Sequence, residues 1–356
     1  MGWSGQLSAN CKPGDRITLT PNASAEGGYT VASFTAPRKG VYQFILKGSG
    51  GTNGSLDADQ YGNNGSSTVP GGAGGITTGY LLLEKGQTVY CGCGGTCSAA
   101  FVSNTNGSKL SSISSGNVLL VAGGGGGSGR AYKGANEAKG AYAGGKGGGT
   151  SGSGGASGGA DWFGQNYAGG GGGTQSSGGK PTSINTSSNG GAGSYGAGGK
   201  GGSSSVDYQN VYAWGGRGGD GYYGGAGGNA AATHNSGEGF TQSHGWGGGG
   251  GSGYLRNATL TYLNNRYTGS TSQGGGASGG SRGSVTVVCY ARGLLPVWFD
   301  GTQLERIFFN GTLLDGLTYN GTTIYMRRLV RCFKSMAARF VSRAATRASF
   351  RSALTA

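Results

Sequence analysis

The sequence predicts a mainly β fold, in which a β-sandwich carries a large inserted bundle of polyglycine II helices. Glycine fills 87 of 356 positions, whereas a usual share is about 7%. Short apolar runs alternate with turn residues, and glycine recurs at every third position through the middle of the chain. The chain also holds 19 Tyr, 11 Phe and 5 Trp, so it has apolar material to bury. Six prolines are too few for collagen, which needs abundant proline in a strict triplet repeat.

Short apolar runs bounded by glycine or proline predict the strands of the sandwich. Residues 36–40, Ala-Pro-Arg-Lys-Gly, separate the first two runs and predict a hairpin between them. The last run ends near residue 290, so we expect the sheets to close around the insertion. The runs are 29–34, 41–46, 80–83, 88–90, 118–121 and 285–290.

Glycine at triplet spacing predicts the insertion, from about 123 to 283. Polyproline II geometry has three residues per turn and no internal hydrogen bonds. Glycine at every third position leaves one bare edge, so neighbouring backbones can approach and bond sideways. A flexible Gly/Ser linker is the alternative, but interleaved aromatic residues favour an ordered bundle. The expected scaffold glycines are Gly215, Gly218, Gly221, Gly224 and Gly227.

Aromatic residues within the insertion are the candidates for receptor contact, because loops on a rigid scaffold commonly carry function. These candidates are Trp162, Tyr195, Trp214, Tyr222, Tyr223 and Trp246.

The chain organisation changes after the glycine-rich domain, which we place at 1–292. Residues 293–325 contain three ten-residue units with Asp-Gly or Asn-Gly followed by Thr, at 297–302, 307–312 and 317–322. An Asn-Gly or Asp-Gly pair between apolar runs is a strong hairpin signal. We therefore expect a short β-repeat region that packs on the body or on other copies of the chain.

The whole chain has a net charge of +14, and the tail at 326–356 contributes eight Lys/Arg and no acid to it. Leu329, Phe333, Met336, Phe340 and Ala344 form an apolar stripe at helical spacing, which predicts a basic amphipathic α-helix. Its candidate contact residues are Arg331, Arg339, Arg343, Arg347 and Arg351. Three roles stay open: a docked or disordered tail, contact with an anionic membrane or a partner, and contact with nucleic acid.

Cys91, Cys93 and Cys97 are the one cluster with ligand-like spacing. A disulfide cluster and buried or free thiols are the main alternatives, since structural zinc prefers two CxxC pairs or added histidine. The two histidines, His234 and His244, have no serine or acid partner placed by the sequence for a catalytic triad. We therefore expect no catalytic site, no metal and no cofactor.

Several motifs in order resemble one known family. Phe34-Thr35-Ala36-Pro37 leads to Gly48-Ser49-Gly50-Gly51, and Leu119-Leu120-Val121-Ala122 leads into a glycine run that returns at 247–253. Over roughly 28–290 the chain resembles the glycine-rich domain in the extracellular part of the anaplastic lymphoma and leukocyte tyrosine kinase receptors. Similar segments occur in bacterial and bacteriophage surface proteins, including tail-fibre adhesins. The resemblance implies a jelly-roll-like sandwich with an inserted polyglycine bundle.

These features favour a non-enzymatic surface adhesin of a phage tail fibre or bacterial surface. The repeats resemble Asn-Gly-Thr units at the ends of phage tail proteins, which favours a virion. The expected partner is a host receptor, protein or glycan, and we expect a homo-oligomer or assembly member. Alternatives are an architectural virion or filament subunit that binds neighbouring copies, and a soluble relative of the receptor domains. No secretory signal is visible at residues 1–6, so we expect an extracellular or virion-surface location reached by another route.

Overall fold

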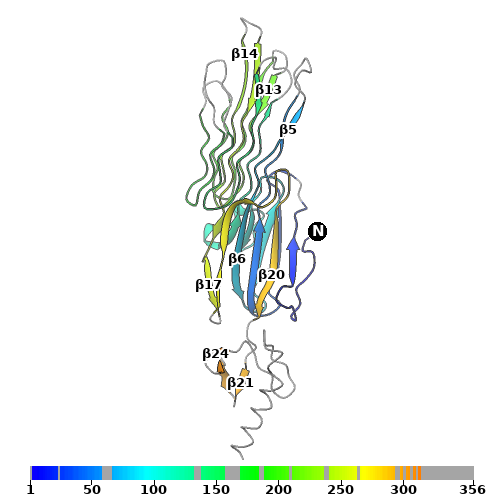
Figure 1. Ribbon diagram of the computed structural model, residues 1–356, viewed down its shortest axis with the longest axis vertical. Helices are drawn as coiled ribbons and strands as arrows, with labels where there is room; N and C mark the ends of the chain where they lie inside the picture. The colour runs from blue at the N-terminus through cyan, green and yellow to red at the C-terminus, as the bar shows by residue number, and fades with distance from the viewer. Residues whose placement is uncertain are drawn as a thin grey trace, which may run out of the picture. The chain divides into compact units, whose positions relative to one another are not determined.

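The computed structural model describes most of the chain up to Arg292 and four short strands beyond it. The described residues are 2–22, 25–57, 66–131, 138–156, 169–183, 188–207, 211–235, 240–262, 265–292, 297–299, 302–304, 308–309 and 312–313. The chain divides into two compact units, Met1–Arg292 and Gly293–Ala356. Figure 1 shows the sandwich of the first unit around β6 and β20, with the glycine-rich segments running from it to β13 and β14.

The first sandwich sheet has five antiparallel strands in the order β1–β20–β3–β6–β19. The last strand of the unit, β20, lies between β1 and β3. Strands from the two ends of the first unit therefore pair in one sheet, as predicted. The bounds are β1 (Arg16–Leu19), β3 (Gly40–Lys47), β6 (Gly75–Leu83), β19 (Ser270–Gly275) and β20 (Ser284–Arg292).

The second sandwich sheet also has five antiparallel strands, in the order β16–β9–β8–β7–β2. Two short 3₁₀ helices, η1 (Leu110–Ser112) and η2 (Ser115–Asn117), connect β8 to β9. The hairpin β17 (Thr259–Tyr262) and β18 (Asn265–Thr268) follows β16. The strands of the second sheet are β2 (Tyr29–Thr35), β7 (Thr88–Gly94), β8 (Ala100–Ser103), β9 (Val118–Ala122) and β16 (Tyr254–Leu255).

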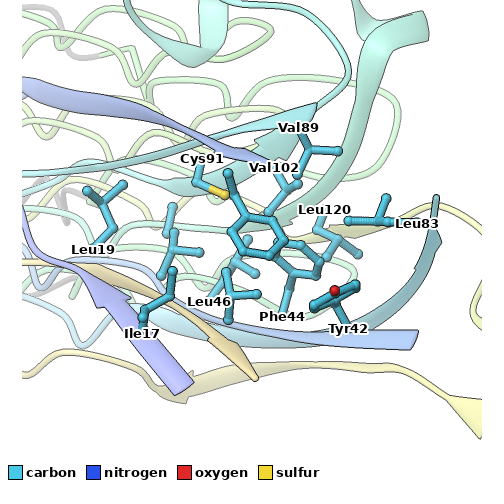
Figure 2. Close-up of a cluster of buried hydrophobic side chains, with 14 of the residues drawn as sticks. Ile17, Leu19, Tyr42, Phe44, Leu46, Leu83, Val89, Cys91, Val102 and Leu120 are labelled. Atoms are coloured by element: carbon cyan, nitrogen blue, oxygen red, sulfur yellow. The ribbon is translucent and has the colours of Figure 1, made fainter. Parts of the chain in front are cut away.

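The two sheets enclose one apolar core (Figure 2). Tyr42, Phe44 and Leu46 alternate along β3 and are fully buried, as expected where one strand face meets a core. Phe34 of the opposite sheet lies 5.3 Å from Tyr42 and 6.0 Å from Phe44 between ring centroids. Burying each such large side chain stabilises the fold by about 1.5–3 kcal/mol. The predicted mainly β fold, with two sheets packed as a β-sandwich, is therefore confirmed.

The hairpin predicted at 36–40 is wrong. β2 pairs with β7, whereas β3 pairs with β6 and β20, so residues 36–39 carry the chain from one sheet to the other. Strands that face each other across a core have the same alternating apolar pattern as strands that pair side by side. Pro37 has no N–H to contribute to a tight hairpin ladder, which is consistent with a crossing.

The glycine-rich segments form neither helices nor strands over long stretches, yet their backbone groups are hydrogen-bonded. Along 246–252, the amides of Gly248 and Gly251 donate to the carbonyls of Gly127 and Gly124, at 2.8 and 3.0 Å. The residues next to them bond to other neighbours: the amides of Gly249 and Ser252 donate to the carbonyls of Ala226 and Tyr223, and the Gly250 amide donates to the Ser153 carbonyl. The bonding direction therefore repeats every three residues, and the segment satisfies its buried amides on several neighbours.

The glycine-rich body is not one continuous insertion at 123–283. Residues 48–54 and 71–75, between β3 and β6, also enter it, and the Gly72 amide donates to the Gly126 carbonyl at 2.8 Å. Conversely β16 and β19, inside the predicted insertion, are edge strands of the two sandwich sheets.

Two small sheets lie at the end of the glycine-rich body remote from β6 and β20 (Figure 1). One has the order β12–β13–β10–β4–β5, with β10 and β4 parallel, and the other has the order β11–β15–β14, with β11 and β15 parallel. Their bounds are β4 (Gly54–Leu56), β5 (Ser67–Val69), β10 (Arg130–Ala131), β11 (Ala138–Ala141), β12 (Ser203–Val206), β13 (Val211–Trp214), β14 (Ala230–Asn235) and β15 (Phe240–Gly245).

Two antiparallel pairs are described in the second unit. β21 (Val297–Phe299) pairs with β22 (Thr302–Leu304), and β23 (Phe308–Phe309) pairs with β24 (Thr312–Leu313). The third repeat and the predicted tail helix, 326–356, lie outside the described residues, with Arg331, Arg339, Arg343, Arg347 and Arg351.

Candidate functional site

The six aromatic residues predicted to contact a receptor lie in different surroundings. Trp162 is outside the described residues. Trp246 has no exposed surface, because its ring lies between Tyr142, at 6.0 Å, and His244, at 5.7 Å. Its assignment as a contact residue is therefore wrong: it follows β15 and packs inside the body.

Three of the tyrosines form a packed cluster beside η1. Tyr195 donates from its hydroxyl to the Ile113 carbonyl at 2.8 Å and meets Tyr222 and Tyr223 edge-on. Tyr222 also stacks on Tyr254 with 4.0 Å between ring centroids. These rings are only partly exposed and join the glycine-rich body to the sandwich, so packing accounts for them.

Trp214 is 38% exposed, and within 2–290 it is the only exposed large hydrophobic side chain among the residues whose side-chain burial the structure describes. It lies on β13, in the five-stranded sheet at the remote end of the body. The Tyr212 ring, two residues earlier on the same strand, is 5.8 Å away and within 15° of parallel. The structure thus brings Trp214 together with Tyr212, which is not among the predicted contact residues.

We call the exposed side of this sheet the aromatic face, formed by Arg130, Ser203, Ser205, Tyr212 and Trp214. Cross-strand register places them together, since Trp214 pairs with Ser203 and Arg130, and Tyr212 pairs with Ser205. Directly opposed residues project from the same side of a sheet.

Alternation along β13 explains why this face is exposed. Val211 and Ala213 are fully buried, and Val211 packs with Val206 and Ala232 beneath the sheet. Residues two apart share a face, so Tyr212 and Trp214 project to the other side.

One ion pair lies beside the aromatic rings. The Arg130 guanidinium carbon is 5.4 Å from the centre of the Trp214 ring, a cation–π distance. Nη2 of Arg130 is also 3.5 Å from Oδ2 of Asp57, and the Asp57 amide donates to the Ala131 carbonyl at 3.1 Å. The charge of Arg130 is therefore balanced locally by a carboxylate fixed by the backbone.

The five expected scaffold glycines lie where backbones meet. A methyl group at Gly215, Gly218, Gly224 or Gly227 would overlap a carbonyl oxygen, and one at Gly221 would overlap the Ser252 backbone. Only a hydrogen atom fits at these positions.

The cysteine cluster predicted as a disulfide alternative consists of free, buried thiols in this structure. Cys91 and Cys93 belong to the sandwich core, whereas the Cys97 thiol lies 3.3 Å from a Glu26 carboxylate oxygen. Burial, with the Glu26 charge, raises the pKa of Cys97 to about 12. In the described part of the chain, no group of three or more potential ligands could hold a metal ion.

A buried polar cluster around Asp220 was not predicted from the sequence. Asp220 is 2% exposed and forms an ion pair with Arg217 at 2.7 Å. It also accepts from the Tyr29 hydroxyl, at 2.8 Å, and from the Gly198 amide, at 2.8 Å. Burial and the Asp220 charge raise the pKa of Tyr29 well above 10.0, so this hydroxyl keeps its proton. The Arg-Gly-Gly-Asp sequence at 217–220, with opposite charges three residues apart, is the feature from which this ion pair could have been predicted.

No protein-family model matches this chain, and no curated protein matches it at a significant level. Within the described residues, no helix has the length and apolar composition that crossing a membrane requires.

Proposed function

We propose that this chain is a non-enzymatic surface adhesin of a phage tail fibre or bacterial surface. In this proposal the glycine-rich body is a rigid spacer that presents the aromatic face to a receptor. The observation that carries the proposal is the position of Trp214, exposed on a small sheet at the end of the body remote from the sandwich strands.

The body fulfils this role if its segments are polyglycine II helices. Support comes from hydrogen bonds whose direction repeats every three residues, since this helix has three residues per turn. Support also comes from the glycines, where a methyl group would overlap a neighbouring backbone. Backbone-to-backbone packing leaves few rotatable side chains inside, which makes a stiff support. With the sandwich, such a bundle gives the jelly-roll-like domain that the resemblance implies.

The rival proposal is an architectural virion or filament subunit that binds neighbouring copies of itself. The two functions differ in what the aromatic face contacts, because an adhesin binds a cell surface and a filament subunit binds another chain. The basic tail at 326–356 adds a separate contact in either case, to a membrane, a partner or nucleic acid.

Binding to cells tests the proposal. The labelled full chain is incubated with a panel of bacterial strains and cultured animal cells, beside the variants Trp214→Ala and Tyr90→Ala. Tyr90 is a partly exposed aromatic residue on sandwich strand β7 and serves as the matched control. We expect saturable binding to at least one cell type that Trp214→Ala weakens and Tyr90→Ala preserves.

Light scattering over a concentration series separates the rival. Growth into long assemblies that Trp214→Ala abolishes, without binding to any cell, would favour the architectural function. A chain that binds cells equally well with and without Trp214 would contradict the proposed role of the aromatic face.

A further inference from the structure

We infer that the aromatic face binds a neutral sugar ring of a cell-surface glycan, with the pyranose packed against Trp214. This inference rests on the proposed adhesin function and specifies the chemistry of its receptor.

The limited apolar area of the face favours a small ligand. A stable protein–protein interface buries about 800 Å² on each partner. On this face only Trp214 is an exposed large hydrophobic side chain among the residues whose burial the structure describes, and Tyr212 beside it is half-buried. Two rings are enough for one or two sugar residues, but they supply only a small part of an interface with a folded protein.

The polar groups of the face match the two sides of a sugar. A pyranose has a patch of C–H groups, which an aromatic ring can contact through dispersion and weak C–H interactions, and a rim of hydroxyls. Ser203 and Ser205 place hydroxyls on the strand next to the rings, and a hydroxyl both donates and accepts. Both serines are exposed, so these groups are accessible to a ligand.

The charge balance favours a neutral sugar over an acidic one. Arg130 would attract the carboxylate of an acidic sugar, but the Asp57 carboxylate lies 3.5 Å from its guanidinium. A second anion placed there would be repelled by Asp57 at short range. The guanidinium N–H groups and the Asp57 oxygens can instead bond sugar hydroxyls, as charged groups form the stronger hydrogen bonds.

The test uses the full chain on a printed array of defined neutral, sialylated and sulfated oligosaccharides, followed by titration calorimetry with the best soluble ligand. We expect binding to neutral oligosaccharides. Trp214→Ala should weaken it by about tenfold or more, since a factor of ten corresponds to about 1.4 kcal/mol and a lost aromatic contact is of that order. Trp214→Phe keeps an aromatic ring, so its affinity should lie between those of the parent and Trp214→Ala. Tyr90→Ala should bind like the parent.

Folding of each variant is checked by its melting temperature, so that loss of binding is not loss of structure. Several outcomes overturn the inference: binding only to acidic oligosaccharides, neutral-glycan binding that Trp214→Ala leaves unchanged, or no glycan binding at all. If the chain still binds cells in the last case, the sugar assignment fails and the adhesin function stands. If it binds neither cells nor glycans, both fail.

Discussion

Nη2 of Arg217 lies 2.7 Å from Oδ1 of Asp220, in an ion pair buried between the glycine-rich body and sandwich strand β2. The backbone of Asp220 adds one further link to the sandwich, because its amide donates to the Cys97 carbonyl, while its carbonyl accepts from the Gly124 amide within the body. A single residue thus connects the two parts of the first unit through both its side chain and its backbone.

Asp220→Asn should destabilise the first unit strongly. The substitution removes the carboxylate that pairs with Arg217 and leaves its largely buried guanidinium with only the weaker attraction of the Glu26 carboxylate. Breaking a buried pair from one side costs about 3–5 kcal/mol. Urea unfolding followed by intrinsic fluorescence measures the change in unfolding free energy.

The matched control is Glu84→Gln, which breaks the exposed Lys39–Glu84 pair at 2.8 Å. Exposed pairs contribute about 0–1 kcal/mol, so this variant should unfold close to the parent. Similar unfolding free energies for Asp220→Asn and Glu84→Gln would contradict the role assigned to the buried pair.

The sandwich could be predicted from sequence because its strands have a strong local signal. Runs such as 41–46 are apolar at nearly every position and are bounded by turn residues, and they lie within the observed strands. Strands of the small remote sheets such as Ala230–Asn235 and Ser203–Val206 had no such signal, since they are built from small and polar residues. Pairing between distant segments was also hidden, because Tyr29 and Asp220 are 191 residues apart.

Gly218→Ala should lower the stability of the first unit. The new methyl group would overlap the carbonyl oxygen of Gly225, and neither backbone can move without breaking hydrogen bonds to its neighbours. Overpacking of this kind costs about 1–3 kcal/mol. Thermal unfolding by circular dichroism or calorimetry gives the shift in melting temperature.

Gly154→Ala is the control within the glycine-rich segments themselves. At this position the nearest atom to a new methyl carbon is the Gly170 carbonyl oxygen at 3.6 Å, an ordinary contact. Replacing glycine without strain often stabilises a protein by about 0.4–1 kcal/mol through the unfolded state. The melting temperature should therefore stay level or rise, and equal decreases for both variants would argue against close backbone packing. A serine such as Ser204 gives no second control, because it lies in β12 and its hydroxyl accepts from the Ala232 amide at 3.0 Å.

The candidate site could be predicted only in part. Trp214 and Trp246 look alike in sequence, since glycine follows each of them directly. They differ in what precedes them: Val211, Tyr212 and Ala213 form a short apolar run that ends in Trp214, whereas Trp246 follows a polar run. The four-residue run does not show which of its side chains are exposed. The burial of Trp246 depends on Tyr142, which is distant in sequence, so no local pattern could reveal it.

Trp246→Ala and Trp214→Ala should therefore differ sharply in stability. Removing the fully buried ring of Trp246 leaves a cavity between Tyr142 and His244, and such truncations cost about 3–5 kcal/mol. Removing the Trp214 ring, which is 38% exposed, should cost less because it leaves no enclosed cavity. Its contacts with Arg130 and Tyr212 account for about 0.5–1 kcal/mol of the loss. Paired urea titrations check this, and a larger loss for Trp214→Ala would reverse the assignment of the two residues.

Stability should fall when the pH rises above about 9. Burial raises the pKa of Cys11 from 9.0 to about 11, with the neighbouring Cys289 adding to the shift, and burial raises the pKa of Cys93 to about 12. In the unfolded chain these thiols ionise near 9.0, while the folded chain keeps them protonated. The unfolded state then binds fewer protons, so the stabilisation is complete below about pH 9 and is lost as the pH approaches the folded values. Melting temperatures in a non-thiol reductant from pH 7.5 to 10.5 measure the decline.

Cys93→Ala removes one of these thiols and should show a shallower decline than the parent, whatever its stability at pH 7.5. A parent melting temperature that stays constant from pH 8.5 to 10.5 would mean that the thiols ionise alike in both states.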